Sequence, residues 1–312
     1  MSQLDGVLVI DKPSGPTSHD VVARVRRALG LSRIGHTGTL DPLATGVLPL
    51  VIGRATRLAS LFSATEKEYD AAVRLGAATE TYDAAHRAGP APPAPEGIDA
   101  ARVDRALDEF RGTYEQMPPP YSAKKVDGVP AYKAARRHDP VELRAVTVTV
   151  SDLSLTSYID GLACLRVRSS AGFYVRSLAH DLGGRLGCGA HLESLRRVRA
   201  GTFEEAAAVA LATVEAEGRA ASQWVIPMNR LLFHVPAVVL NERGVRRAAH
   251  GNDLAFDDVV PASGTGRAEA GFGTAAGATA GGRWRLLDEA GTLLAIAETR
   301  PGGALHPVIV LM

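Results

Sequence analysis

The sequence predicts an α+β fold: a mixed, mainly antiparallel sheet with flanking helices, followed by a small C-terminal β-rich module. Three observations predict it. Strand-like and helix-like segments follow one another without a steady βαβ rhythm, an Asp160-Gly161 turn separates the strand-like segments 146–150 and 162–167, and short apolar runs fill the C-terminal part. We expect two domains, residues 1–228 and 229–312, which the chain length allows.

The first elements are a strand and a helix. An apolar run at 4–10 predicts a short buried strand. A helix is expected over 19–29, where apolar residues recur at i, i+4 and i+8 from Val21, with Ser18 as a candidate N-cap and Gly30 as the stop.

A strand at 69–75 comes next. The Pro-rich segment 89–97 predicts a connector, because proline fits neither a helix interior nor a central strand. Asp99 is placed to cap a helix over 100–111. After the hairpin, helical spacing of apolar residues from Val175 predicts another helix, with Arg176 in its first turn.

The C-terminal part contains four short apolar runs, at 235–240, 284–287, 293–297 and 308–311. Turn signals separate them, so we expect a small β-rich module. A segment at about 262–282 is rich in Gly and Ala with almost no large apolar side chain, which predicts a disordered insert.

Composition narrows the function classes. The chain of 312 residues is 46% hydrophobic, contains no apolar run of membrane-spanning length and begins without a basic and apolar leader pattern. Two cysteines, Cys164 and Cys188, without a Cys-x-x-Cys motif, indicate a reducing cytoplasm and no disulfide. We therefore expect a cytoplasmic protein without a membrane partner.

Positive charge is concentrated in two blocks although the net charge is only +1. Residues 161–201 hold seven Arg against two carboxylates, and residues 121–138 hold five basic residues, Lys124 among them, against one carboxylate. Such blocks fit a localised polyanion-binding face; solvated helix faces are the alternative.

The segment 35–49 is the most informative. Its three glycines and two prolines predict a constrained loop, and its leucines and valine indicate that Asp41 lies at the edge of a core. A carboxylate in such a partly dry cleft needs a cationic partner, and we expect that cation to lower its pKa. The alternative is that Asp41 caps the turn before Pro42.

This loop resembles the catalytic motif of the tRNA pseudouridine synthase B (TruB) family. Segments 11–18, 67–83, 118–136 and 172–192 resemble four further motifs of that family, in the same order and spacing, so the resemblance covers about residues 5 to 200. It implies the pseudouridine synthase fold, a PUA-like RNA-binding domain at the C-terminus, and isomerisation of the uridine at position 55 in the T-loop of tRNA. That reaction gains and loses nothing, so no redox cofactor, ATP or metal is demanded.

The resemblance also assigns roles. Asp41 is the catalytic carboxylate and Arg176 its cationic partner. Tyr69 stacks on the target base and is a candidate to move the C5 proton. Whether Asp41 attacks C1′, attacks C6 or removes the C2′ proton stays open. In their ordinary roles, Arg176 would pair with Asp181 or with phosphate, and Tyr69 would be a plain strand aromatic.

The remaining assignments concern RNA binding. Tyr174 and Leu195 match positions that contact the bound nucleotide, and His36 matches the residue that fills the gap left by the extruded base. Lys12 and Lys124 are expected to contact the RNA backbone. The ordinary alternatives are a core leucine, a loop histidine that makes hydrogen bonds, and solvated lysines.

The sequence motifs typical of zinc sites, phosphate-binding loops and serine hydrolases are not present. The nine histidines form no His-x-x-x-His or Glu-x-x-His pair, and no phosphate loop or Gly-x-Ser-x-Gly elbow is present. We expect a tRNA-binding monomer without a metal. Two alternatives stay open: an RNA-binding or RNA-folding protein on the same scaffold, and a glycosidase-like hydrolase, which lacks an evident second carboxylate.

Overall fold

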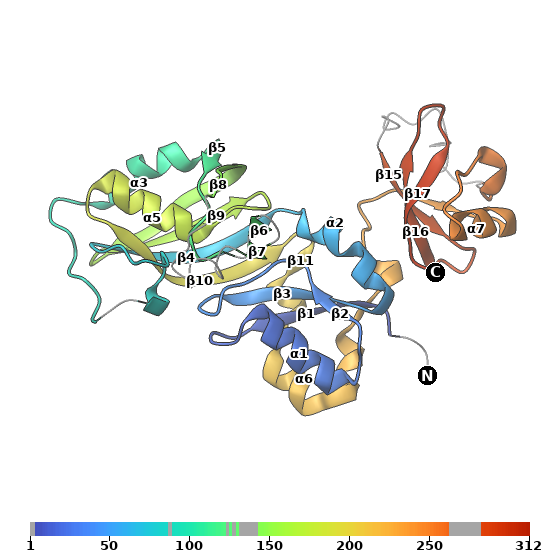
Figure 1. Cartoon of the computed structure of the whole chain (residues 1–312), viewed down its shortest axis with the longest axis horizontal. Helices are drawn as coiled ribbons and strands as arrows, with labels where there is room; N and C mark the ends of the chain where they lie inside the picture. The colour runs from blue at the N-terminus through green and yellow to red at the C-terminus, as the bar shows by residue number, and fades with distance from the viewer. Residues whose placement is uncertain (1–3, 87–88, 123–124, 127–128, 131–142, 262–281) are drawn as a thin grey trace.

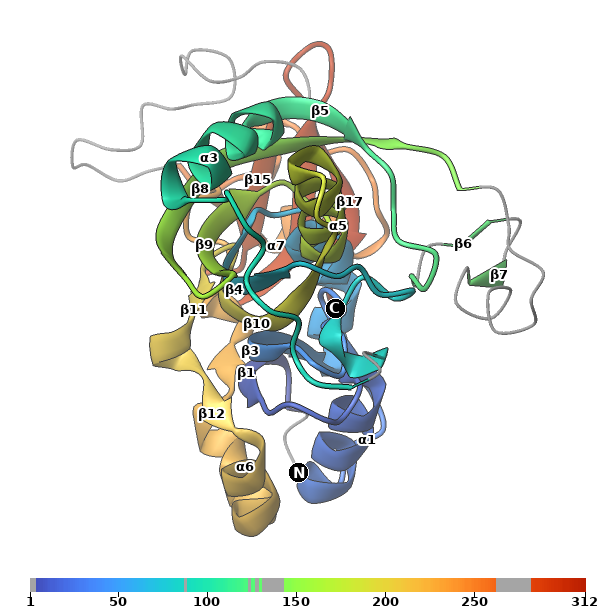
Figure 2. The same cartoon turned by 90° about the vertical axis from the view of Figure 1, so that its left-hand side faces the viewer.

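The structure is a computed structural model of the whole chain that describes residues 4–86, 89–122, 125–126, 129–130, 143–261 and 282–312. Figures 1 and 2 show an elongated body built on one large twisted sheet, with a smaller sheet at the C-terminal end. Lys124 and the segment 262–281 lie outside the described residues. No helix among the described residues is long and apolar enough to cross a membrane.

The main sheet has eleven strands, eight of them in the order β12-β1-β3-β10-β4-β9-β8-β5. Two pairs are parallel, β1 with β12 and β10 with β3, and the other pairs are antiparallel. The strands are β1 (Gly6–Lys12), β2 (Ile34–His36), β3 (Thr45–Ile52), β4 (Lys67–Leu75), β5 (Gly112–Gln116), β8 (Val146–Ile159), β9 (Leu162–Ser169), β10 (Ala190–Ala200), β11 (Phe203–Glu204), β12 (Val209–Ala210) and β13 (Ile226–Pro227). The predicted mixed, mainly antiparallel sheet is confirmed.

Strand β1 shows why this sheet is buried. It alternates between two cores: Leu8 and Ile10 belong to the cluster under the helices, whereas Val7 and Val9 belong to a second cluster on the other face. A strand buried on both faces reads as a continuous apolar run, which is the signal that the sequence carries here.

Helix α1 (Ser18–Leu29) begins one residue earlier than the sequence predicted. Thr17 is the N-cap, and it forms a capping box with Asp20. Gly30 ends the helix in the left-handed conformation, as expected. Ser18 is therefore not the cap; its hydroxyl instead bonds to the backbone of Leu40.

The other helices of the main body are α2 (Ala59–Ser63), α3 (Ala100–Leu107), α5 (Val175–Leu186) and α6 (Leu211–Glu217). Asp99 caps α3 as predicted, but the helix ends at Leu107 and a 3-10 turn follows. Short 3-10 helices are η1 (Gly53–Leu58), η2 (Ala84–His86), η3 (Asp108–Phe110), η4 (Glu205–Ala207), η5 (Gly218–Trp224), η6 (Met228–Arg230) and η7 (Phe256–Asp258). The larger core cluster joins the main sheet to α1, α3, α5 and α6.

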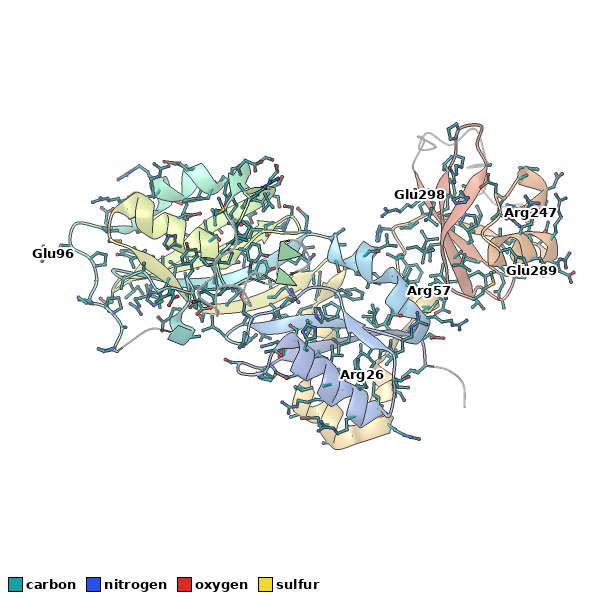
Figure 3. All side chains as sticks on the ribbon, viewed as in Figure 1. Arg26, Arg57, Glu96, Arg247, Glu289 and Glu298 are labelled. Carbon is teal, nitrogen blue, oxygen red and sulfur yellow. The ribbon has the colours of Figure 1, made fainter. Side chains whose placement is uncertain are left out.

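The C-terminal sheet has the order β14-β15-β16-β17, from strands β14 (Ala237–Val239), β15 (Arg283–Leu287), β16 (Leu293–Thr299) and β17 (Leu305–Val310). It also carries α7 (Glu242–Ala249), a helix that the sequence analysis did not predict. Ile296 and Leu311 share a core cluster with the main sheet, and Arg57, labelled in Figure 3, donates to the carbonyl of Val310. A separate hairpin, β6 (Lys125–Val126) with β7 (Val129–Pro130), extends from the main body.

Candidate functional site

The loop between β2 and β3 carries Asp41 and is fixed on both sides of it. Before Asp41, the Ser18 hydroxyl donates to the Leu40 carbonyl at 3.0 Å and accepts from the Leu40 N–H at 2.8 Å. After it, the N–H of Gly15 donates to the Pro42 carbonyl at 2.8 Å. A loop tied in this way holds the carboxylate in place before any substrate arrives.

Lys12 forms the third tie. Its side chain is fully buried, and its ammonium group donates to the carbonyls of Pro13 at 2.9 Å, Pro42 at 3.2 Å and Ala44 at 2.7 Å. Burial lowers the pKa of Lys12 to about 8, and Asp41 opposes that fall. The prediction that Lys12 contacts the RNA backbone is wrong, because all three protons of a buried ammonium already serve the loop.

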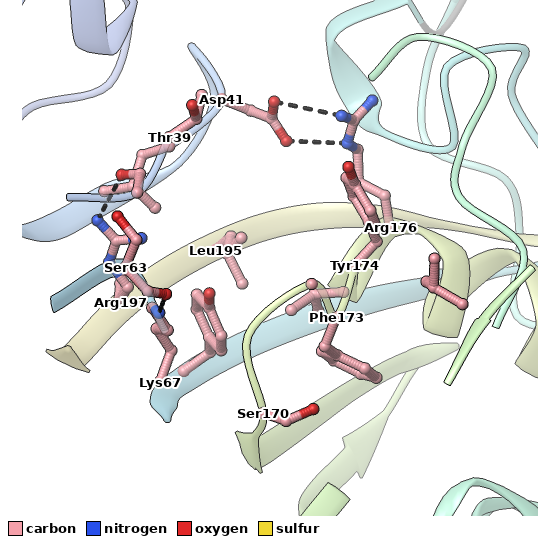
Figure 4. A pocket seen from close by; sticks show the side chains of 16 residues that line it. Thr39, Asp41, Ser63, Lys67, Ser170, Phe173, Tyr174, Arg176, Leu195 and Arg197 are labelled. Atoms are coloured by element: carbon pink, nitrogen blue, oxygen red, sulfur yellow. Dashed lines mark hydrogen bonds and ion pairs between the residues drawn. The ribbon is translucent and has the colours of Figure 1, made fainter. Parts of the chain in front are cut away.

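Asp41 and Arg176 form a two-pronged ion pair. The guanidinium Nε lies 2.9 Å from Oδ2 of Asp41, and Nη2 donates to Oδ1 at 3.2 Å. Figure 4 shows the pair at one side of the pocket. The Arg176 side chain is 7% exposed and that of Asp41 is 35% exposed, so the cation is buried while the carboxylate faces the pocket. The predicted pairing of these two residues is confirmed.

Arg176 is itself held by the segment that precedes η2. Its Nη1 donates to the Thr81 carbonyl at 3.1 Å and lies 3.8 Å from Oδ2 of Asp83. The hydroxyl of Thr81 donates to the other oxygen of Asp83 at 2.8 Å. A buried carboxylate therefore stands behind the guanidinium, on the side away from Asp41, and fixes the orientation of its planar group.

The electrostatics of Asp41 differ from the expectation. Burial raises the pKa of the Asp41 carboxyl above its ordinary value of 3.8; Arg176 opposes the rise and Asp83 adds to it. The prediction that the cation would hold this pKa below its ordinary value is wrong, because desolvation outweighs the attraction.

A pocket of about 440 Å³ opens beside this ion pair. That volume lies in the range typical of small-molecule sites. Its walls carry apolar and aromatic side chains together with Asp41 and the cations. The residues that line it are Gly38, Thr39, Leu40, Asp41, Ser63, Lys67, Tyr69, Val146, Ser170, Gly172, Phe173, Tyr174, Val175, Arg176, Leu195 and Arg197.

Strand alternation explains which side chains face the pocket. On β4, Lys67 and Tyr69 line it, whereas Glu68 pairs with arginines elsewhere. On β10, Leu195 and Arg197 line it, and a register shift after Arg197 turns the next arginine away. Within the residues that the structure describes, no group of three His, Cys, Asp or Glu side chains is arranged to hold a metal ion.

Comparison with known proteins decides the family. Residues 26–175 match the N-terminal domain model of TruB family pseudouridylate synthases, and residues 176–232 match the C-terminal domain model of tRNA pseudouridylate synthase B. The chain is 47% identical over 258 residues to the tRNA pseudouridine synthase B of Solibacter usitatus, covering 80% of this chain and 86% of that protein. It is 40% identical to the protein of the same name from Thermobifida fusca, with 98% of each covered.

The chain belongs to the TruB family. A solved structure agrees: the chain in an H/ACA RNP bound to a substrate RNA containing 2′-deoxyuridine matches with a TM-score of 0.70 at 25% identity, covering 98% of this chain and 85% of that one.

Five of the residues that the resemblance to the TruB family singled out lie around one pocket: Asp41, Tyr69, Tyr174, Arg176 and Leu195. The backbone of Tyr174 exchanges two hydrogen bonds with the side chain of Gln116, at 2.8 and 3.1 Å, which fixes the start of α5. Leu195 is 8% exposed, and its carbonyl accepts from the hydroxyl of Thr45.

His36 does not line the pocket. It ends β2, half-buried, with its ring edge-on to His19 at 5.2 Å between centroids. Burial lowers the pKa of His36 below 6.5, with His19 and Arg197 adding to the fall. A neutral imidazole results at neutral pH, which suits stacking rather than ion pairing. The prediction for Lys124 stays a prediction, since that residue lies outside the described part of the chain.

Sequence reasoning did not assign three residues that the structure places here. Asp83 stands behind Arg176, and Lys67 and Arg197 line the pocket. Each lies within or next to a segment that resembles a family motif, which was the available signal. Asp83 and Arg197 contact residues far away in sequence, and Lys67 donates to carbonyls only two and four residues before it, so no spacing pattern connects the three to one pocket.

Proposed function

We propose that this chain isomerises uridine to pseudouridine in tRNA, at position 55 of the T-loop, with Asp41 as the catalytic carboxylate. One observation carries the proposal: the Asp41 carboxylate, held by two atoms of a buried guanidinium, faces a pocket with aromatic and apolar walls. The names of the relatives, tRNA pseudouridine synthase B, support the same reaction.

The isomerisation suits this donor set. The bond between N1 and C1′ breaks, the base turns, and C5 bonds to C1′, so no atom is gained or lost. One oriented carboxylate serves as nucleophile or base for that sequence. Asp41 therefore acts on the sugar or the base directly, and Arg176 orients it and keeps it ionised.

Side chains on the pocket walls receive the base. Tyr69 offers a flat apolar face with a polar tip, which fits stacking on the uracil and removal of the C5 proton. Tyr174 and Leu195 form the opposite contacts of the nucleotide. Each of these residues lines the pocket that Asp41 faces.

The target base must leave the stack before it reaches Asp41, at a cost of a few kcal/mol. His36 lies five residues before Asp41, in the strand that leads into the loop. We propose that its neutral ring stabilises the gap in the T-loop. We also propose that Lys124 contacts the RNA backbone.

The finer organisation is proposed on the same basis. Residues 1–228 form the catalytic domain that performs the reaction, and residues 229–312 form a PUA-like module that contacts RNA, with an insert at about 262–282. The protein acts as a monomer in the cytoplasm, on tRNA, without a cofactor.

The test is incubation of the pure protein with an unmodified tRNA transcript and no additives, followed by mapping of pseudouridine. We expect pseudouridine in the T-loop at position 55 and none in a transcript whose position 55 is cytidine. Binding of tRNA without any pseudouridine would contradict the proposal and favour an RNA-folding protein. Release of free uracil would favour a hydrolase.

A further inference from the structure

The pocket carries more buried positive charge than its carboxylates balance. Three basic side chains that line it are almost fully buried: Arg197 at 1%, and Lys67 and Arg176 at 6% exposed. Lys12, which holds the Asp41 loop without lining the pocket, is a fourth buried cation at 0%. Asp41 and Asp83 are the carboxylates that contact this set, and Arg176 lies between them. Buried charges are normally paired, so an excess of buried cations calls for an explanation.

Of the buried cations that line the pocket, Arg197 and Lys67 are the two that contact no carboxylate among the described residues. Arg197 donates to the carbonyls of Val47 at 2.7 Å and Gly38 at 3.2 Å, and Lys67 donates to those of Thr65 at 2.6 Å and Ser63. Neither forms an ion pair with a carboxylate anywhere in the described ranges.

The opposite face of the same strands shows a different arrangement. There, Arg199 lies 3.2 Å from Glu68, and Arg166 lies 2.9 Å from Asp70. The chain therefore supplies acids to the arginines on that face and supplies none to the cations that face the pocket.

Burial makes these unpaired charges costly. It lowers the pKa of Lys67 to about 8, with Arg197 adding to the fall. It also lowers the pKa of Arg197, and the nearby Tyr69 is the group that opposes this fall. A negative charge in the pocket would relieve both costs, because attraction in a dry site is strong.

The position of the two cations indicates where that negative charge forms. Figure 4 shows Lys67 and Arg197 on the side of the pocket away from Arg176, with Leu195 between the two sides. Tyr69 lies on the same strand as Lys67 and interacts with Arg197. If the base stacks on Tyr69 with its sugar toward Asp41, as the proposed function requires, the two cations are the charged groups on its side of the pocket.

We propose that Arg197 and Lys67 stabilise the uracil anion that forms when the N1–C1′ bond breaks. This inference rests on the proposed function. The electron pair of the broken bond stays on the base, spread over N1 and the two carbonyl oxygens. An electron pair from the ring then forms the C5–C1′ bond, C5 loses its proton and N1 gains one, so atoms and charge balance.

This role differs from binding of a phosphate. Charge on the base develops only as the bond breaks, so the two cations lower the barrier of the chemical step and leave ground-state affinity for RNA nearly unchanged. Loss of one such preorganised group typically slows the step by about 100-fold or more.

The test compares single-turnover rates and tRNA affinity for Arg197→Met and Lys67→Met. We expect each variant to slow the chemical step by about 100-fold, with Kd for tRNA within about twofold of the unsubstituted protein. The matched control is Arg199→Met, on the same strand but paired with Glu68, which should keep the rate.

A second substrate keeps the inference falsifiable. A tRNA transcript with 5-fluorouridine at the target position has a base whose anion is intrinsically more stable, so it needs less help from cations. We expect the defect of both variants to shrink by at least tenfold on this substrate, measured as loss of intact 5-fluorouridine. Arg197→Lys, which keeps the charge, should recover part of the rate if Arg197→Met fails to fold.

Three outcomes would overturn the inference. Weakened tRNA binding with an unchanged chemical step would mean that the cations hold a phosphate. An equal defect on uridine and 5-fluorouridine would mean that they only position the loop. Full activity of both variants would mean that they do neither. Absence of pseudouridine with the unsubstituted protein would instead refute the proposed function.

Discussion

Substitution of Arg176 by lysine tests how the ion pair controls Asp41. Lysine keeps the positive charge but replaces a planar fork with a point charge. It cannot reproduce both contacts to Asp41, at 2.9 and 3.2 Å, while also reaching the carbonyls of Thr81 and Tyr121. A charge-assisted hydrogen bond contributes about 1.5–3 kcal/mol.

The pH dependence of the rate tests the ionisation of Asp41 more directly than the rate at a single pH does. The Asp41 side chain is 35% exposed, so solvent screens part of the loss and the lower figure, about 1.5 kcal/mol, applies. Because this hydrogen bond favours the ionised carboxylate, its loss raises the pKa of Asp41 further. Asp41 must be ionised to act, so activity falls as pH falls through this pKa, and the variant loses activity at a higher pH.

The assay is single-turnover pseudouridine formation from pH 5 to pH 8. We expect Arg176→Lys to be about 100-fold slower at neutral pH, because the carboxylate is misplaced, and its acid limb to move to higher pH. The matched control is Arg185→Lys on the same helix, where the arginine is exposed and pairs with Glu109. A defect of equal size at every pH would refute the idea that Arg176 sets the ionisation of Asp41.

Substitutions at three further positions test the supports of the site. Lys12→Met should lower the free energy of unfolding by about 1–3 kcal/mol, because buried carbonyls lose their donor. Between about pH 8 and 10.5 the unfolded chain binds more protons at Lys12 than the folded protein does, so the unsubstituted protein gains stability as pH rises. The difference in free energy of unfolding between the two proteins, measured in urea, should therefore widen as pH rises across that window. Asp83→Asn should slow the reaction about tenfold and move the acid limb to lower pH, because Asp83 raises the pKa of Asp41; a limb that moves up would count against this arrangement. Tyr82 has a φ of 64° and stacks on His180 at 3.8 Å between centroids, so Tyr82→Ala should lower the free energy of unfolding by about 1 kcal/mol, whereas Tyr82→Phe should leave it unchanged; equal stability of both would argue against the stack.

Local patterns predicted the elements that position the site. The apolar spacing from Val175 predicted α5 and placed Arg176 in its first turn, and the Asp160-Gly161 turn predicted the β8–β9 hairpin. The Asp41 loop was identified because glycine, proline and a carboxylate among apolar residues are unusual together. Such signals are short-range, and the chain expresses them directly.

The features that could not be predicted from the sequence depend on contacts with residues that are distant along the chain. Lys12 reads as a solvated lysine until Pro42 and Ala44 supply their carbonyls, about thirty residues away. Helix α7 is short and arginine-rich, and it contains Gly244, which in the sequence alone indicates a helix breaker. The structure explains this glycine, because the backbone of Asp258 comes so close that a side chain would not fit there. The raised pKa of Asp41 follows from its desolvation inside the folded protein, which spacing does not reveal.

The most direct measurement is single-turnover pseudouridine formation by Asp41→Asn, together with its tRNA affinity. Asparagine keeps the shape of the side chain and removes the charge, so we expect Kd for tRNA within about threefold of the unsubstituted protein and no detectable product. The matched control is Asp70→Asn, which removes a carboxylate that pairs with Arg166 outside the pocket and should leave turnover intact. Normal turnover by Asp41→Asn would contradict the central claim that this carboxylate performs the isomerisation.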